Sequence, residues 1–165
     1  MSHTVELLAV GTELLLGGTV NTDARDLSRE LSALGLNVYY HSVVGDNPER
    51  LAAAVALAKS RADVLITTGG LGPTCDDLTK EVVAAAYGRR LEFHPEFADA
   101  IRAYFACSHR SMPDNNLQQA WLPERCTVLE NRWGTAPGCA FREGDRYVVM
   151  LPGPPSECIP MFREE

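Results

Sequence analysis

The residues best suited to chemistry gather near the middle of the chain, where a glycine-rich loop is followed by two adjacent aspartates. Gly69, Gly70 and Gly72 form the loop, and glycine lets a ligand approach the bare backbone closely. Backbone N–H groups there and at the start of a following helix favour an anion such as a phosphate. Asp76 and Asp77 come next, and two carboxylates repel a phosphate unless a divalent cation lies between them. The stretch therefore indicates a phosphate site that uses a metal ion.

A simpler interpretation of Asp76 and Asp77 stays open. Aspartate often caps a helix by accepting hydrogen bonds from its first N–H groups, and a helical pattern follows here that Gly88 is suited to end. One aspartate suffices for such a cap, so the second has no role in this interpretation.

The elements that position these residues follow from the apolar patterning. Residues 64–66 form a short apolar run, typical of a strand buried on both faces. Residues 5–10 and 37–44 predict two earlier strands, and amphipathic helices are expected after Asn21 and from Pro48. This alternation predicts parallel strands, right-handed crossovers and helices on both faces of the sheet.

The second half of the chain is less regular. A helix is expected to open at Pro95, and residues 108–116 predict a polar loop with a short helix from Asn116. A final helix is expected with Ser156 as its N-cap. Three further strands are predicted, at residues 127–129, 139–142 and 146–151, the last two as a hairpin.

Three polar residues lie close to the predicted strands. Glu13 follows the first strand, at the edge where open α/β sheets meet their ligands, although a solvated loop charge is the simpler role for it. Asn21 starts a helix, so a capping role competes with contact to a ligand. His41 lies inside the second strand and is interpreted as a packed or edge histidine.

Composition narrows the class of protein. The 165 residues predict one domain, with a formal net charge of −7 and no basic run, which argues against direct nucleic-acid binding. No apolar stretch reaches the ~20 residues of a membrane span. The five cysteines form no CxxC pair, so neither a zinc site nor a disulfide framework is indicated. We expect a cytoplasmic protein.

Five segments resemble the nucleotide-utilising N-terminal domain of the competence/damage-inducible CinA proteins. They are VGTELLLGGTVNTDA (10–24), VVGDNPERL (43–51), TTGGLGPTCDDLTKE (67–81), ENRWGTAPG (130–138) and LPGPPSE (151–157). Together they span nearly the whole chain in order. The resemblance implies an α/β fold of the molybdopterin-binding type, a three-layer α/β/α sandwich around a mostly parallel sheet.

The resemblance also implies an activity, the metal-dependent hydrolysis of ADP-ribose to AMP and ribose 5-phosphate with Mg²⁺ or Co²⁺ as cofactor. It implies catalytic roles for Asp76, Asp77 and Lys80, although Lys80 is equally compatible with a solvated lysine. Glu13 would join Asp76 and Asp77 as a metal ligand. The implied substrate-binding residues are Gly69, Gly70, Gly72, Thr74, Asn21, Gly153 and Ser156.

Further expectations follow from the same resemblance. Full-length relatives carry a second, nicotinamide mononucleotide deamidase domain, which we expect to be absent, with residues 1–165 as a single domain truncated at its C-terminal end. The expected partner is a small nucleotide, and a homo-oligomer is expected, with a dimer favoured. Cys75 lies beside two carboxylates that disfavour its thiolate, so no covalent step is assigned to it.

Two other functions stay open. Molybdopterin-binding enzymes of molybdenum cofactor biosynthesis share the fold, but their loop typically reads GGTG followed by an Arg-Asp pair. Here Leu71 replaces the threonine and Asp76 replaces the arginine. An arginine pairs directly with an anionic ligand, whereas an aspartate repels it unless a metal ion lies between them. A non-catalytic nucleotide-binding module is the third interpretation, because a fold alone does not decide function.

Overall fold

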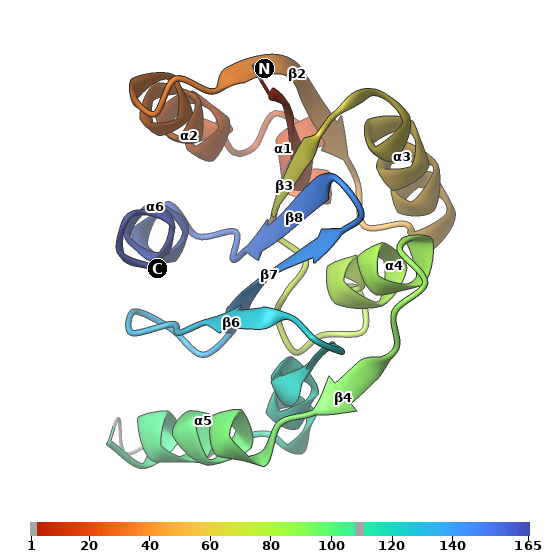
Figure 1. Cartoon of the computed structure of the whole chain (residues 1–165). Coiled ribbons are helices and arrows are strands. Elements are labelled where there is room, and N and C mark those ends of the chain that lie inside the picture. The colour runs from red at the N-terminus through yellow and green to blue at the C-terminus, as the bar shows by residue number, and fades with distance from the viewer. Residues whose placement is uncertain (1–2, 108–110) are drawn as a thin grey trace.

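The centre of the molecule is one six-stranded sheet in the order β2-β1-β3-β8-β7-β6 (Figure 1). It is seen in a computed structural model that describes residues 3–107 and 111–165. The strands are β1 (Thr4–Val10), β2 (Asn37–Val44), β3 (Val64–Thr68), β6 (Thr127–Leu129), β7 (Gly138–Glu143) and β8 (Arg146–Leu151).

Strand direction confirms the prediction of a mostly parallel sheet. β1 pairs in parallel with β2 and β3, and β3 pairs in parallel with β8. β7 runs antiparallel to β8 and to β6. The reversal follows from the tight connection between β7 and β8, where Gly144 takes a positive φ of 59° that suits glycine.

Helices cover both faces of the sheet and complete the three layers. Helices α2 (Thr22–Ala33) and α6 (Pro155–Glu164) lie on one face, and α3 (Pro48–Arg61) and α4 (Thr79–Ala86) lie on the other (Figure 1). The α/β/α sandwich expected from the sequence is therefore confirmed. No helix in the described part of the chain is long and apolar enough to cross a membrane.

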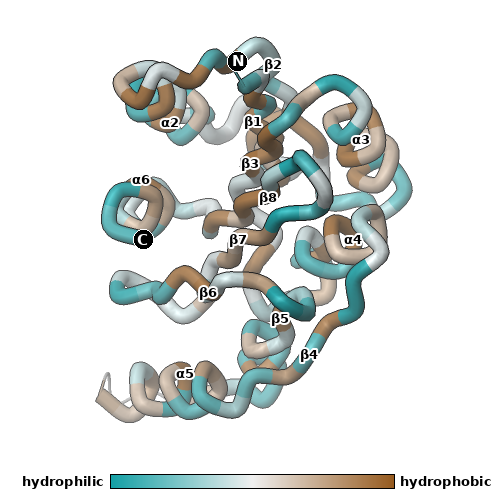
Figure 2. Tube along the Cα trace, viewed as in Figure 1, coloured by the Kyte–Doolittle hydropathy of each residue, from teal (hydrophilic) through white to brown (hydrophobic). Residues whose placement is uncertain are grey.

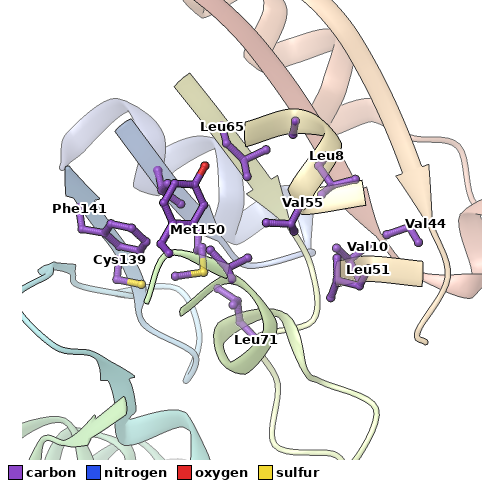
Figure 3. Packing of buried hydrophobic residues seen from close by; sticks show 14 of the residues in the cluster. Leu8, Val10, Val44, Leu51, Val55, Leu65, Leu71, Cys139, Phe141 and Met150 are labelled. Carbon is purple, nitrogen blue, oxygen red and sulfur yellow. The ribbon is translucent and has the colours of Figure 1, made fainter. Parts of the chain in front are cut away.

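Each face of the sheet has its own apolar core, because successive strand residues point to opposite faces. Leu8 and Leu65 pack with Val55 beneath α3 and α4 (Figure 3). Leu7, the neighbour of Leu8, packs with Leu27 beneath α2. Figure 2 shows the resulting hydrophobic band along the central strands.

A buried ion pair ties the sheet to α3. Glu6 on β1 is 1% exposed, and its carboxylate accepts hydrogen bonds from Arg61 Nε at 2.8 Å and Nη2 at 2.7 Å. Ser42 Oγ on β2 donates to the same carboxylate at 2.6 Å. Three donors therefore compensate the burial of this charge.

A small layer beside the main sheet was not predicted. β4 (Leu91–Phe93) and β5 (Trp121–Pro123) pair antiparallel, and each is too short for its periodicity to be recognised. Helix α5 (Pro95–Cys107) starts as expected, and the 3₁₀ helix η1 (Asp114–Ala120) starts before the predicted Asn116. The predicted loop 108–116 includes residues 108–110, which lie outside the described residues.

Helix starts required three corrections. α4 begins at Thr79 without a side-chain cap, so the interpretation of Asp76 and Asp77 as helix caps is wrong. The predicted N-cap at Ser156 is also wrong, because α6 begins at Pro155, whose fixed φ suits the first helical position. Glu13, for which a charge in a loop was the simpler interpretation, lies instead in the short helix α1 (Thr12–Leu15).

Candidate functional site

A cleft of about 640 Å³ lies at the carboxyl ends of the parallel strands. The segments after β1, β2, β3 and β8 converge on it, together with the start of α2. This is the edge at which open α/β sheets bind ligands, and the volume suits a molecule of nucleotide size.

The glycine loop is held tightly against β1 and α4. Gly69 and Gly70 have positive φ angles of 90° and 67°. A Cβ at Gly69 would collide with the carbonyl oxygen of Val10, and one at Gly70 with Oγ1 of Thr79. Thr79 Oγ1 donates to the Gly69 carbonyl at 2.9 Å. Glycine is therefore needed at both positions to form a loop that exposes its backbone to the cleft.

The aspartate pair lies at the rim of the cleft, in a turn before α4. Asp77 Oδ2 accepts hydrogen bonds from Thr74 N at 2.9 Å and from Thr74 Oγ1 at 2.6 Å. Within the described residues, Oδ1 of Asp77 has no hydrogen-bond partner and is available to a ligand. Asp76 is exposed and has no side-chain hydrogen bond within the described residues. Both side chains, with Thr74, line the cleft.

Lys80 does not line the cleft, although the sequence suggested a phosphate contact there. Its side chain is buried, and Nζ donates to the carbonyl oxygens of Gln118 at 2.9 Å and Gln119 at 3.3 Å. The alternative of a solvated lysine is wrong, because Lys80 is 2% exposed. Burial lowers the pKa of Lys80, and its visible role is to join α4 to η1.

The other predicted contacts divide between the cleft and its surroundings. Asn21 lines the cleft and also caps α2, since its Oδ1 accepts from Ala24 N at 3.1 Å. Gly72 and Gly153 also line the cleft. Ser156 is exposed and outside the lining, although the residues on either side of it belong to the lining. His41 is an edge residue as predicted, 2.9 Å from Ser28 Oγ.

Glu13 lines the same cleft as Asp76 and Asp77, but the three do not form one cluster. Within residues 3–107 and 111–165, no three His, Cys, Asp or Glu side chains lie close enough to hold a metal ion. The side chains of the cleft therefore do not form a complete metal-coordination shell by themselves. They do fit Mg²⁺, which commonly takes one or two carboxylates and completes its shell with phosphate oxygens and water. Asp76 and Asp77 are the carboxylates that would hold such an ion.

The charge of the cleft is all of one sign. None of the described residues that line it is a lysine, arginine or histidine, and none is aromatic. Its acidic side chains are Glu13, Asp23, Asp46, Asp76, Asp77 and Glu157. An anionic ligand therefore needs a cation with it in order to enter.

Sequence reasoning missed three of these acids. Asp46 follows β2, and its Oδ2 accepts from Thr12 N at 2.9 Å and Thr12 Oγ1 at 2.8 Å. Glu157 accepts from Asn131 Nδ2 at 2.7 Å and so joins the start of α6 to the loop between β6 and β7. For Asp46, its position after a predicted strand was the available signal.

Asp23, in the first turn of α2, is the most unusual of the three. Its side chain is 6% exposed, and its buried Oδ1 has no hydrogen-bond partner in the described structure. Burial, with a smaller contribution from Asp26, raises the pKa of Asp23 from 3.8 to about 6. The sequence gave no warning, because an acid in the first turn of a helix is ordinary.

Comparison with known proteins gives close relatives. The family profile described as "Probable molybdopterin binding domain" matches residues 6–165. A competence-damage inducible protein of Acetivibrio thermocellus is 55% identical over 95% of this chain and 38% of its own length. One of Clostridium acetobutylicum is 53% identical over 96% of this chain and 39% of its own. The chain thus spans less than half the length of these curated relatives.

The chain also resembles solved structures. The crystal structure of the protein CinA from Thermoplasma acidophilum, described as of unknown function, is 31% identical, with a TM-score of 0.88 over 98% of this chain and 95% of that one. The molybdopterin biosynthesis enzyme MoaB from Thermus thermophilus has a TM-score of 0.64 at 20% identity, over 97% of this chain and 87% of its own. That second likeness shows a shared fold.

Proposed function

The chain belongs to the CinA proteins within the probable molybdopterin binding domain family, and on this premise we propose that it is a metal-dependent nucleotide pyrophosphatase. Its substrate is ADP-ribose and its products are AMP and ribose 5-phosphate. The observation that carries the proposal is the cleft around the glycine loop, in which every charged side chain among the described lining residues is acidic.

The charge of the cleft favours a metal-bound diphosphate over a bare anion. A diphosphate would meet six carboxylates and no basic side chain among the described lining residues. A divalent ion that enters with the diphosphate removes this repulsion. The same charge disfavours any ligand whose phosphate must pair directly with arginine or lysine.

The residues of the chain have separate tasks in this reaction. Backbone groups of the glycine loop bind the phosphate oxygens. Thr74 holds one oxygen of Asp77, which orients the other, and Asp76 supplies a second carboxylate at the rim. A bound divalent ion supplies charge neutralisation and activation of water. Water adds across the phosphoanhydride, so that one P–O bond breaks, one forms and a proton is released.

Binding of a molybdopterin is the second candidate, favoured by the name of the family and by the MoaB-like fold. The lining of the cleft argues against it. A pterin is a flat aromatic ring, and no described lining residue offers an aromatic face on which it could stack. A non-catalytic nucleotide-binding module is the remaining candidate and differs from the first in turnover alone.

The test is release of AMP from ADP-ribose, followed by chromatography with Mg²⁺ or Co²⁺. Asp76→Asn is the sharpest variant, because Asp76 holds no turn together, whereas Asp77 does. We expect its rate to fall about 10²-fold or more, with a smaller loss of binding. Asp145→Asn on the exposed β7–β8 turn is the matched control and should leave the rate unchanged.

Three results would contradict the proposal. Full activity of Asp76→Asn would exclude Asp76 from the reaction. Binding of ADP-ribose without turnover in any metal would leave a nucleotide-binding module. A thermal shift with a pterin and none with ADP-ribose or AMP would favour the molybdopterin candidate.

A further inference from the structure

Asp23 lies at the wall of the cleft, and one oxygen of its carboxylate has no hydrogen-bond donor within the described residues. Buried polar atoms are almost always hydrogen-bonded, yet Oδ1 of Asp23 is buried and unpaired in the described structure. The side chain belongs to the lining of the cleft. A ligand in the cleft is therefore in a position to supply the missing donor.

Within the described residues, no hydrogen bond satisfies Oδ1 of Asp23, and the titratable groups near it do not compensate its charge. The charged or titratable neighbours that face it are Asp26 on its own helix and the Cys158 thiol on α6. Burial, and then the nearby Asp23, raise the pKa of Cys158, so the thiol remains neutral and offers at most a weak donor. Neither neighbour compensates an ionised carboxylate, which burial alone destabilises.

The adjoining wall is formed by the segment after β8, which includes Pro152, Pro154 and Pro155. Proline has no N–H group, so these residues cannot donate to the carboxylate. Without an aromatic side chain in the described lining, the wall also offers no stacking surface for a nucleobase. A small ring that carries several hydroxyl donors suits this wall better than a flat base.

This wall lies directly beside the loop expected to hold phosphate. A Cβ added to Gly153 would be 3.2 Å from Cα of Gly69, so the two backbones are in close contact. A phosphate on the glycine loop would therefore place the sugar attached to it next to this segment, which leads into α6, and Cys158 of α6 lies near Asp23. Carboxylates bind ribose hydroxyls in this way beside other phosphate-binding loops.

We propose that Asp23 forms a sugar subsite, in which its carboxylate accepts hydrogen bonds from the vicinal hydroxyls of a phosphorylated ribose. The inference rests on the proposed function for the class of ligand, and it adds the residue that recognises the hydroxyl groups of the sugar. Two riboses of ADP-ribose carry such hydroxyls, that of the AMP half and that of the ribose 5-phosphate half, and the experiment distinguishes them.

The experiment measures affinity by calorimetry with Mg²⁺ at pH 7.5, without turnover. The ligands are compared in two pairs, ribose 5-phosphate with 2-deoxyribose 5-phosphate, and AMP with 2′-deoxy-AMP. In the wild type, we expect one pair to favour the ligand that keeps its 2-hydroxyl by about 10-fold or more, the scale of a hydrogen bond to a charged group. The pair that discriminates identifies which ribose Asp23 contacts.

Variants separate sugar recognition from a structural role. Asp23→Asn should reduce the preference to about 2-fold or less, while Asp26→Asn, an acid on the same helix outside the lining, should keep it. If Asp23 only stabilised the fold, its replacement would lower the melting temperature of the protein. We expect instead that ligand-free Asp23→Asn melts at a higher temperature than the wild type at pH 7.5.

Four outcomes would overturn the inference: equal affinity within both pairs in the wild type, no binding of any of the four ligands, an undiminished preference in Asp23→Asn, or a lower melting temperature for ligand-free Asp23→Asn. The first two need no variant, so misfolding of a variant cannot hide them. Failure of the proposed function would appear instead as missing ADP-ribose turnover with the sugar preference intact.

Discussion

Replacing Asp23 by asparagine should stabilise the ligand-free protein, and the effect should depend on pH. The folded chain raises the pKa of this carboxyl from 3.8 to about 6, because burial disfavours its charge. Between about pH 4 and 6 the folded chain therefore binds the proton more tightly than the unfolded chain does. The free energy of unfolding then falls as the pH rises through this window, and the loss is complete above it.

The size of the effect follows from the same change in pKa. A rise from 3.8 to about 6 corresponds to at most about 3 kcal/mol. Water in the cleft screens part of the charge, so we expect Asp23→Asn to gain about 1–3 kcal/mol at pH 7.5. For a chain of 165 residues this is a rise in melting temperature of about 3–8 °C.

The assay is thermal unfolding of wild type and Asp23→Asn at pH 4.0 and 7.5 by circular dichroism. The two should melt close together at pH 4.0, where the wild-type carboxyl is protonated, and should differ at pH 7.5. Asp26→Asn is the control, because hydrogen bonds from Arg25 lower the pKa of Asp26, so that its replacement should bring no gain. A destabilised Asp23→Asn at pH 7.5, or an equal difference at both pH values, would refute the reasoning.

Three further predictions concern the loop, the metal and the buried ion pair. Gly70→Ala should cost about 2 kcal/mol or more in chemical denaturation, through its positive φ and the collision with Thr79, whereas Gly144→Ala, with open space around it, should cost about 1 kcal/mol. A chelator should weaken ADP-ribose binding at least 10-fold in calorimetry, and equal affinity with and without it would exclude a metal-bound diphosphate. Arg61→Ala should destabilise the fold in urea denaturation, because Glu6 keeps the Ser42 hydrogen bond but loses the cation that compensates its buried charge, and adding Glu6→Gln should recover part of that loss.

The sequence by itself determined the layers of this protein. Strand patterns are local and periodic, so β2 and β6 were predicted with the bounds that the structure has, and the alternation of strands with helices predicted parallel strands. The glycine loop was also predicted from the sequence. Gly69 and Gly70 have positive φ angles, which favour glycine whatever the loop packs against.

Only the tertiary structure decided which side chains meet at the cleft. Three aspartates show this: Asp76 does not cap α4, Asp77 closes the turn before it, and Asp23 has a buried Oδ1 without a hydrogen-bond partner among the described residues. The sequence suggested that Lys80 contacts a phosphate. In the structure its Nζ donates instead to carbonyl oxygens of η1, about forty residues further along the chain. Burial, protonation and hydrogen-bond partners depend on segments that are distant in sequence, and no local pattern records which of them will pack together.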